Sequence, residues 1–226
     1  MGLDLAPFVL SFKLATIVTF ILFLIALPIS WWLSQTRCRL KPFIEALTSL
    51  PIVLPPSVLG FYVLYALSYN SPLGAFFEET FGITLVFNFT GLVIASVFYS
   101  FPFMVQPLQG GFESLNKNML EASYIAGKSS FQTLVHVALP NIKPALLTAL
   151  IVTFAHTVGE FGVVLMVGGS IPGETKVASV AIYEFVETMD YTQAHLYSAI
   201  MLVMSFSVLL GVYLFNQHHT RRIGVR

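Results

Sequence analysis

The chain has 226 residues, of which 56% are hydrophobic and 10% charged, and its formal net charge is zero. Soluble domains carry about 25% charged residues, and one soluble core of this size could not bury so much apolar surface, so we expect lipid to cover part of the molecule. The missing basic excess argues against a nucleic-acid partner, and the single cysteine, Cys38, excludes an intramolecular disulfide or a multi-thiolate metal site.

Five stretches have the length, about 20 apolar residues, at which a helix crosses a bilayer with its backbone amides bonded internally. They are residues 14–33, 46–67, 91–111, 145–167 and 196–215, and only the fourth holds a charged side chain, Glu160. Asp4 precedes the first stretch in place of a basic cluster, so we interpret that stretch as a retained helix and not a signal peptide. The sequence therefore predicts an all-α integral membrane protein with five transmembrane helices.

The basic residues divide unequally between the two sets of loops. Lys13 and Lys176 fall in one set, and nine fall in the other: Arg37, Arg39, Lys41, Lys117, Lys128, Lys143, Arg221, Arg222 and Arg226. Because Lys and Arg concentrate on the cytoplasmic side, we predict that the amino terminus is outside and that the 112–144 loop and carboxyl terminus are cytoplasmic. An odd number of spans does not divide into two equal halves, so we predict a homodimer around a shared path.

The second stretch contains Pro51, Pro55 and Pro56, which remove backbone donors and predict a broken helix. Broken ends expose backbone dipoles that can face a polar pathway, and this makes Ser57 a candidate pathway residue. A kink that serves only packing is the commoner reason for such prolines and stays open here.

The loop after the third span predicts two short helices that meet at a bend. Apolar residues from Met119 to Ile125 follow helical spacing, and Gly127 then marks a helix end because it tolerates a left-handed backbone. Ser129 and Gln132 form a capping box for the second helix, and Pro140 is expected to stop it.

The same loop carries a resemblance to the EAA motif of ABC-importer permeases. The matching residues are Glu121, Ala122, Ser123, Gly127, Leu139 and Pro140, with Ser123 in place of the usual third Ala. The resemblance implies a type I ABC importer transmembrane domain whose coupling helices dock on an ATPase. The residues alone also allow an amphipathic helix lying on the bilayer. The segment 126–129, AGKS, lacks the rest of a phosphate-binding loop, so we expect ATP and Mg to be bound by the partner ATPase and no cofactor by this chain.

The fourth span and the segment after it resemble molybdate-transporter permeases. Residues 159–162 read GEFG, 169–175 read GSIPGET and 181–183 read AIY, with Ser170 in place of Asn and His156 in place of a frequent Arg. The resemblance covers residues 8–216 as one transmembrane domain and leaves 217–226 as a cytoplasmic tail. It implies a molybdate permease of a bacterial inner membrane, with sulfate or tungstate as alternative substrates.

Placing the charged side chain of Glu160 in hydrocarbon is energetically unfavourable, so it should face the bundle interior or water. His156 is its candidate partner because the i, i+4 spacing puts both on one helix face. We expect Glu160 to have a structural or gate-fixing role and not to bind the anion, since a carboxylate repels it, and His156 is a candidate for the pathway or gate beside it. The histidines show no metal-site spacing, and no Ser, His and acid constellation converges, so we do not expect an enzyme.

By resemblance, an extracytoplasmic oxyanion-binding protein delivers the substrate to the homodimer, and two cytoplasmic ABC ATPase subunits drive its conformational change. An ion-gradient-driven secondary transporter, with Glu160 as its proton site, is the alternative from a different class.

Overall fold

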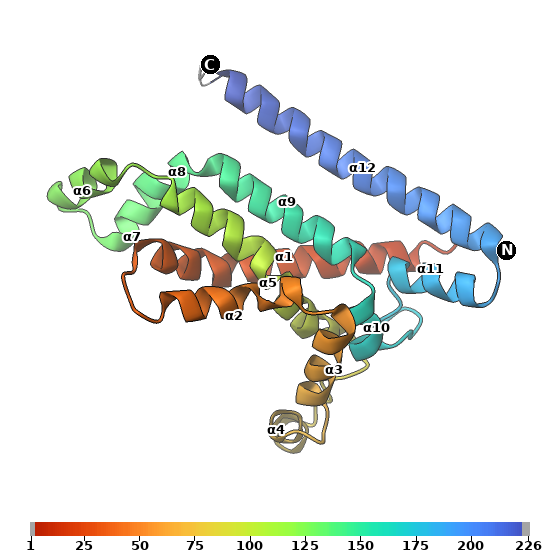
Figure 1. Cartoon of the computed structure of the whole chain (residues 1–226). Helices are drawn as coiled ribbons and strands as arrows, with labels where there is room; N and C mark the ends of the chain where they lie inside the picture. The colour runs from red at the N-terminus through yellow and green to blue at the C-terminus, as the bar shows by residue number, and fades with distance from the viewer. Residues whose placement is uncertain (1–2, 223–226) are drawn as a thin grey trace.

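The computed structural model describes residues 3–222, and every regular element in that range is a helix (Figure 1). The elements are α1 (Ala6–Gln35), α2 (Lys41–Val53), α3 (Pro56–Leu67), α4 (Pro72–Phe81), α5 (Phe89–Glu113), α6 (Lys117–Ile125), α7 (Ser130–Thr133), the π-helical turn η1 (Leu134–Ala138), α8 (Leu139–Asn141), α9 (Lys143–Gly159), α10 (Gly162–Gly168), α11 (Ala178–Glu187) and α12 (Tyr191–Arg222). The predicted all-α class is therefore confirmed.

Three helices, α1, α5 and α9, pack side by side and form the centre of the molecule (Figure 1). On α1, Leu14, Val18 and Leu22 are fully buried at spacings of four residues, which place them on one face. Leu92 and Met104 of α5 are also fully buried. Apolar side chains on the remaining faces stay exposed, as expected of a protein whose outer solvent is lipid.

Within the described residues, three helices are long and apolar enough to cross a membrane: α1, α5 and α12. Two further candidates are bent pairs, so the number rises to as many as five when each pair is taken as one span. One pair is α2 with α3, bent by 110°, and the other joins residues 130–141 to α9 at 83°.

The predicted break in the second span is confirmed and lies at Leu54 and Pro55. Both residues have extended backbone, with ψ of 137° and 138°, and Pro56 then occupies the first position of α3. Pro51 lies inside α2 without ending it, so the break comes from the last two prolines. Pro55 supplies no backbone donor to continue α2, and Pro56 suits a helix start, where the amide has no partner in any case.

The prediction of one continuous helix over 145–167 is wrong. Helix α9 ends at Gly159, Glu160 has extended backbone with ψ of 140°, and α10 restarts at Gly162. The apolar run that predicted the span continues across this break, so hydropathy gives no sign of it.

Two parts of the molecule extend away from the central helices (Figure 1). Helices α3 and α4 project to one side, and α12 leans away after its first turns. The start of α12 is held by Tyr197, whose ring centroid lies 5.0 Å from that of Phe8 and 4.9 Å from that of Phe185. The predicted fifth span lies within α12, which continues through Arg222 into the expected tail; residues 223–226 of that tail lie outside the described residues.

Candidate functional site: the 114–142 loop and the two helix breaks

Helix α6 ends as the sequence predicts, at a left-handed glycine. Gly127 has φ of +78°. Its amide donates to the carbonyl of Tyr124 at 2.9 Å, and the amide of Lys128 donates to that of Ser123 at 3.2 Å. This pair of bonds is a Schellman motif, which satisfies the last carbonyls of the helix and requires a residue that tolerates positive φ.

The capping box that opens the next segment is also present. The Ser129 hydroxyl accepts from the amide of Gln132 at 3.2 Å, and the Gln132 side chain accepts from the amide of Ser129 at 2.9 Å. The helix then widens into η1, where the amide of Leu139 donates to the carbonyl of Leu134. The segment ends at Asn141, one residue beyond Pro140, and turns at Ile142 into α9.

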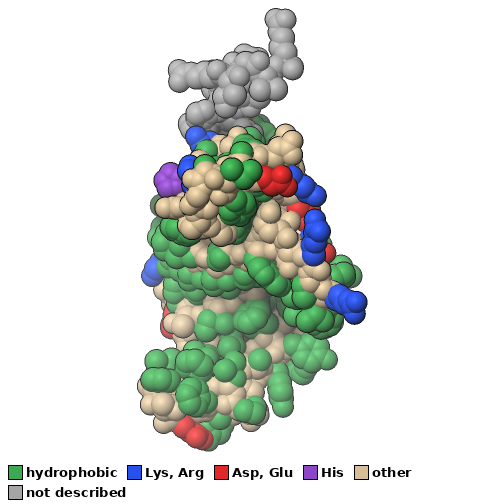
Figure 2. All heavy atoms as spheres, turned by 90° about the vertical axis from the view of Figure 1, so that its left-hand side faces the viewer, with side chains coloured by type: hydrophobic (Ala, Val, Ile, Leu, Met, Phe, Trp, Pro, Cys, Tyr) green, Lys and Arg blue, Asp and Glu red, His purple; other side chains and the backbone are tan. Residues whose placement is uncertain are grey.

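The loop exposes an apolar surface, which we call the loop patch, made of Tyr124, Ile125, Phe131 and Val135. Ile125 is 88% and Phe131 73% exposed. Figure 2 looks onto this end of the molecule and shows hydrophobic surface with Lys and Arg side chains around its edges. The apolar side chains of the second helix are divided between two surroundings, because Leu134 and Ala138 are buried against the protein while Phe131 and Val135 are exposed.

The six residues of the EAA resemblance lie at different depths in the loop. Glu121, Ala122, Gly127 and Pro140 are exposed, Leu139 is half-buried and Ser123 is buried. The Ser123 hydroxyl lies 2.9 Å from that of Thr133, so it joins α6 to α7. An Ala at position 123 could not make this bond, and Ser therefore adds a link between the two short helices.

Aromatic and polar contacts tie the loop to the central helices. The Trp31 indole of α1 donates to the Ser130 hydroxyl at 3.3 Å. Its ring centroid lies 5.1 Å from that of Phe112 of α5, in an edge-to-face arrangement. Ser30 donates to the carbonyl of Val105 at 3.2 Å and joins α1 to α5. The loop therefore contacts α1 through Ser130 and is linked to α5 through Trp31.

A cavity of about 350 Å³ lies between the end of α1 and α6, and Glu121 is one of its lining residues. Basic side chains of Arg37 and Lys117 also line it. Within the part of the chain that the structure describes, no group of three His, Cys, Asp or Glu side chains could hold a metal ion.

The two helix breaks lie against each other, a contact that the sequence does not predict. A Cβ on Gly162 would come within 2.9 Å of Pro56, and a Cβ on Gly60 would come within 2.8 Å of Met166. Small residues at these positions let α3 and α10 approach closely. Ser57 follows Pro56 and is exposed, so the candidate pathway residue lies beside this junction.

The predicted pairing of His156 with Glu160 is wrong. The Glu160 carboxylate accepts from the Val163 amide at 3.0 Å and so caps α10. His156 instead places Nδ1 3.3 Å from the Ser100 hydroxyl and stacks on Phe103, with centroids 3.7 Å apart. The helix ends between the two residues, which removes the i, i+4 geometry on which the prediction depended.

The turn between α10 and α11 is built around its glycines and Thr175. Gly169 and Gly173 have positive φ. Thr175 is fully buried and its hydroxyl accepts from the Ile171 amide at 2.9 Å. Glu184 of α11 pairs with Lys176 and accepts a hydrogen bond from Ser170. The turn that resembles molybdate permeases is thus a tightly bonded unit.

A polar contact between α2 and α5 escaped the sequence reasoning. Lys41 lies 3.0 Å from Glu113 and 3.6 Å from Glu45, and Gln109 bonds both carboxylates. The available signal was the polar spacing in otherwise apolar helices, Glu45 and Ser49 on one and Gln106, Gln109 and Glu113 on the other. Periodicity alone does not say which two helices meet.

Comparison with known proteins agrees with this architecture. The family model described as "Binding-protein-dependent transport system inner membrane component" matches residues 5–225. The molybdenum transport system permease protein ModB of Azotobacter vinelandii is 47% identical over 210 residues, 93% of each chain. A putative molybdenum transport system permease of Bacillus subtilis, YvgM, is 32% identical over 91% of each chain.

Solved structures share the fold at low identity. A chain of the MetNI methionine ABC transporter, in inward-facing conformations, superposes with a TM-score of 0.73 at 16% identity over 92% of both chains. A chain of a bacterial alginate ABC transporter gives a TM-score of 0.70, also at 16% identity, over 99% of this chain and 84% of that one.

The family match spans almost the whole chain, and it confirms the resemblance to importer permeases. Membership makes this protein a multi-pass membrane component without catalytic activity of its own. A binding protein and an ATPase, which binds the ATP, are the other components of such a system. The chain belongs to the family of binding-protein-dependent transport system inner membrane components.

Proposed function

We propose that the chain is the transmembrane permease subunit of an ATP-driven ABC importer for molybdate. The observation that carries this proposal is the 47% identity, over 93% of both chains, to a permease named for molybdenum transport. Relatives named for sulfate transport share 34% identity or less among those compared, which favours molybdate over sulfate. Tungstate has nearly the shape of molybdate and is the remaining alternative.

Two copies of the chain form the translocation path between them in this proposal. Residues 8–216 are the transmembrane domain and 217–226 the cytoplasmic tail. The distribution of nine basic residues against two supports an outer amino terminus and a cytoplasmic carboxyl terminus. The 114–142 loop then lies in the cytoplasm, where two ATPase subunits reach it, and an oxyanion-binding protein docks on the opposite face.

The coupling role is assigned to the loop and the residues of its EAA resemblance: Glu121, Ala122, Ser123, Gly127, Leu139 and Pro140. The loop patch supports this role, because an apolar surface of this kind outside the membrane needs a protein partner to cover it. Trp31 supports it too, since its contacts with Ser130 and Phe112 give the loop a direct connection to α1 and α5. ATPase closure that favours one loop position can therefore shift the conformation of the bundle.

The gate is assigned to the region of the helix breaks, with Ser57, His156 and Glu160. Glu160 acts there by capping α10 and not by binding the anion. His156 acts through its stacking on Phe103 and its contact with Ser100, which hold α9 against α5.

The test is uptake by purified components in proteoliposomes. The permease is reconstituted with its ATPase and binding protein, and ATP-dependent accumulation of molybdate is measured, with tungstate and sulfate as competitors. Strong competition by tungstate and weak competition by sulfate is expected. Uptake of sulfate in preference to molybdate, or uptake that persists without the ATPase, would overturn the proposal.

A further inference from the structure

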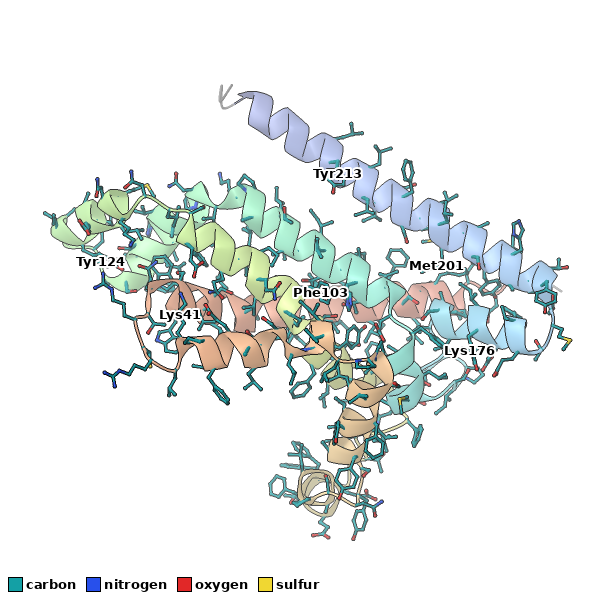
Figure 3. The ribbon with its side chains drawn as sticks, viewed as in Figure 1. Lys41, Phe103, Tyr124, Lys176, Met201 and Tyr213 are labelled. Atoms are coloured by element: carbon teal, nitrogen blue, oxygen red, sulfur yellow. The ribbon has the colours of Figure 1, made fainter. Side chains whose placement is uncertain are left out.

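A band of six polar side chains, which we call the α2–α5 seam, runs between α2 and α5. Its members are Lys41, Glu45, Ser49, Gln106, Gln109 and Glu113. Gln106 donates to the Ser49 hydroxyl at 3.0 Å, and nearer the helix ends Gln109 donates to Glu113 at 3.0 Å. Figure 3 shows α2 alongside α5, with Lys41 near the end that carries α6 and Phe103 farther along α5.

The seam extends to a depth that lipid chains occupy. Helix α5 has 25 residues and is about 37 Å long, about 7 Å longer than the hydrocarbon layer of a bilayer. Gln106 precedes Glu113 by seven residues, or about 10 Å along the axis. In a centred helix only about 3–4 Å extends beyond the hydrocarbon on each side, so the amide of Gln106 lies level with the lipid chains.

The seam is open on the surface of the protomer. The Glu45 side chain is 36% and the Glu113 side chain 44% exposed, and Gln106 is exposed as well. Lipid cannot satisfy the remaining donors and acceptors of these groups, and polar groups at membrane depth face a bundle interior or water. Phe43 and Leu47, which are 68% and 58% exposed, give α2 an apolar surface that suits lipid or protein.

We propose that the α2–α5 seam lines the half of the transport pathway between the helix breaks and the α6 end. This inference rests on the proposed function and adds to it the face of the protomer along which the oxyanion leaves. Lys41 contributes one positive charge and Glu45 and Glu113 two negative ones, a formal sum of −1. Both carboxylates are already engaged by Lys41 and Gln109. The net negative charge disfavours retention of an anion at the seam, and the side chains of Gln106, Gln109 and Ser49 offer only the weak contacts that release requires.

Thiol labelling tests this placement in the complete complex with its ATPase in lipid nanodiscs, where both membrane faces are open to the reagent. The exposed Cys38 is first changed to Ser. Ser49→Cys and Gln106→Cys are then compared with Leu24→Cys, a matched control at an apolar surface position of α1 that is 55% exposed. The reagent is a charged methanethiosulfonate, which reacts with thiolate in water. The two seam variants should react at least about tenfold faster than the control, because hydrocarbon suppresses the thiolate.

Labelling of the seam variants no faster than Leu24→Cys would overturn the inference and leave the seam a polar contact between two helices. Uptake by the Cys38→Ser parent is measured separately in proteoliposomes with ATPase and binding protein. Normal uptake together with unreactive seam cysteines rejects the inference about the seam and leaves the proposed function unaffected. Absent uptake of any oxyanion rejects the proposed function, whatever the labelling shows.

Discussion

Replacing Gly127 tests whether the left-handed end of α6 matters for coupling. The residue has φ of +78°, and a Cβ built on it has no atom within 4 Å. Any effect of Ala must therefore come from the backbone and not from a clash. The left-handed conformation costs an ordinary residue about 1–2 kcal/mol, which corresponds to a roughly 5- to 30-fold change in the population of the intact cap.

Substitutions of Gly127 by Asn, Ala and Val differ in the cost of adopting positive φ. Asn tolerates positive φ, whereas a β-branched residue tolerates it poorly. We therefore expect Gly127→Asn to resemble the parent, Gly127→Ala to lose at least about fivefold in ATPase retention, and Gly127→Val to lose more. Gly211→Ala in α12 is the control, because Gly211 is helical, a Cβ there meets nothing within 4 Å, and Ala is slightly favoured in a helix.

The measurement is the fraction of ATPase that co-purifies with the permease, together with ATP hydrolysis stimulated by the binding protein. A parent-like Gly127→Val would refute the reasoning, since it would show that the Schellman geometry is dispensable. Equal loss in the Asn and Val variants would also refute it, because side-chain bulk and not φ would then be responsible.

Three further changes probe the breaks and the outer turn. Gly60→Val should destabilise the complex by about 1–3 kcal/mol through its clash with Met166, measured by thermal unfolding; an unchanged melting temperature would contradict the α3–α10 contact. Glu160→Gln keeps an acceptor for the α10 cap and should weaken uptake more than assembly, while Glu160→Leu should also destabilise the helix by about 0.5–2 kcal/mol. Equal loss of purified complex and uptake with Gln would make the residue purely structural. Burial acts to raise the pKa of Glu184, but the ion pair with Lys176 and a hydrogen bond from a hydroxyl hold this pKa below its ordinary 4.5. The carboxylate therefore stabilises the turn fully above pH 4.5, and this stabilisation is lost as pH falls below that value. Glu184→Gln should weaken the dependence on pH of the rate at which a protease cleaves the turn. An unaltered dependence would contradict this role of the ion pair.

Local signals in the sequence predicted the 114–142 loop well. Gly127, Ser129 and Gln132 act through bonds to residues within a few positions of themselves, so short-range chemistry fixes their geometry. Pro55 and Pro56 likewise predicted a break, because a missing amide and a restricted backbone act where they stand.

Contacts between distant segments were beyond the sequence reasoning. The break at Glu160 has no proline, and flanking apolar residues continue the hydropathy signal across it. The predicted pairing of Glu160 with His156 required a continuous helix, and it is wrong because the helix ends between them. The meeting of Gly162 with Pro56 depends on tertiary packing, which periodicity does not encode. Membrane orientation, the homodimer and the assigned coupling and gate residues stay predictions.

The two halves of the broken second span have different attachments. Helix α3 is locked to α10 through Gly60, whereas α2 has no buried side chain and is held to α5 through polar bonds. Hydrogen bonds exchange partners more readily than interlocked glycine contacts separate, so we expect α2 to move relative to α5 more easily than α3 moves relative to α10. Natural variation should follow this asymmetry. Substitutions at the α3–α10 contact should occur in compensating pairs, whereas substitutions on the outer surface of α2 should occur singly.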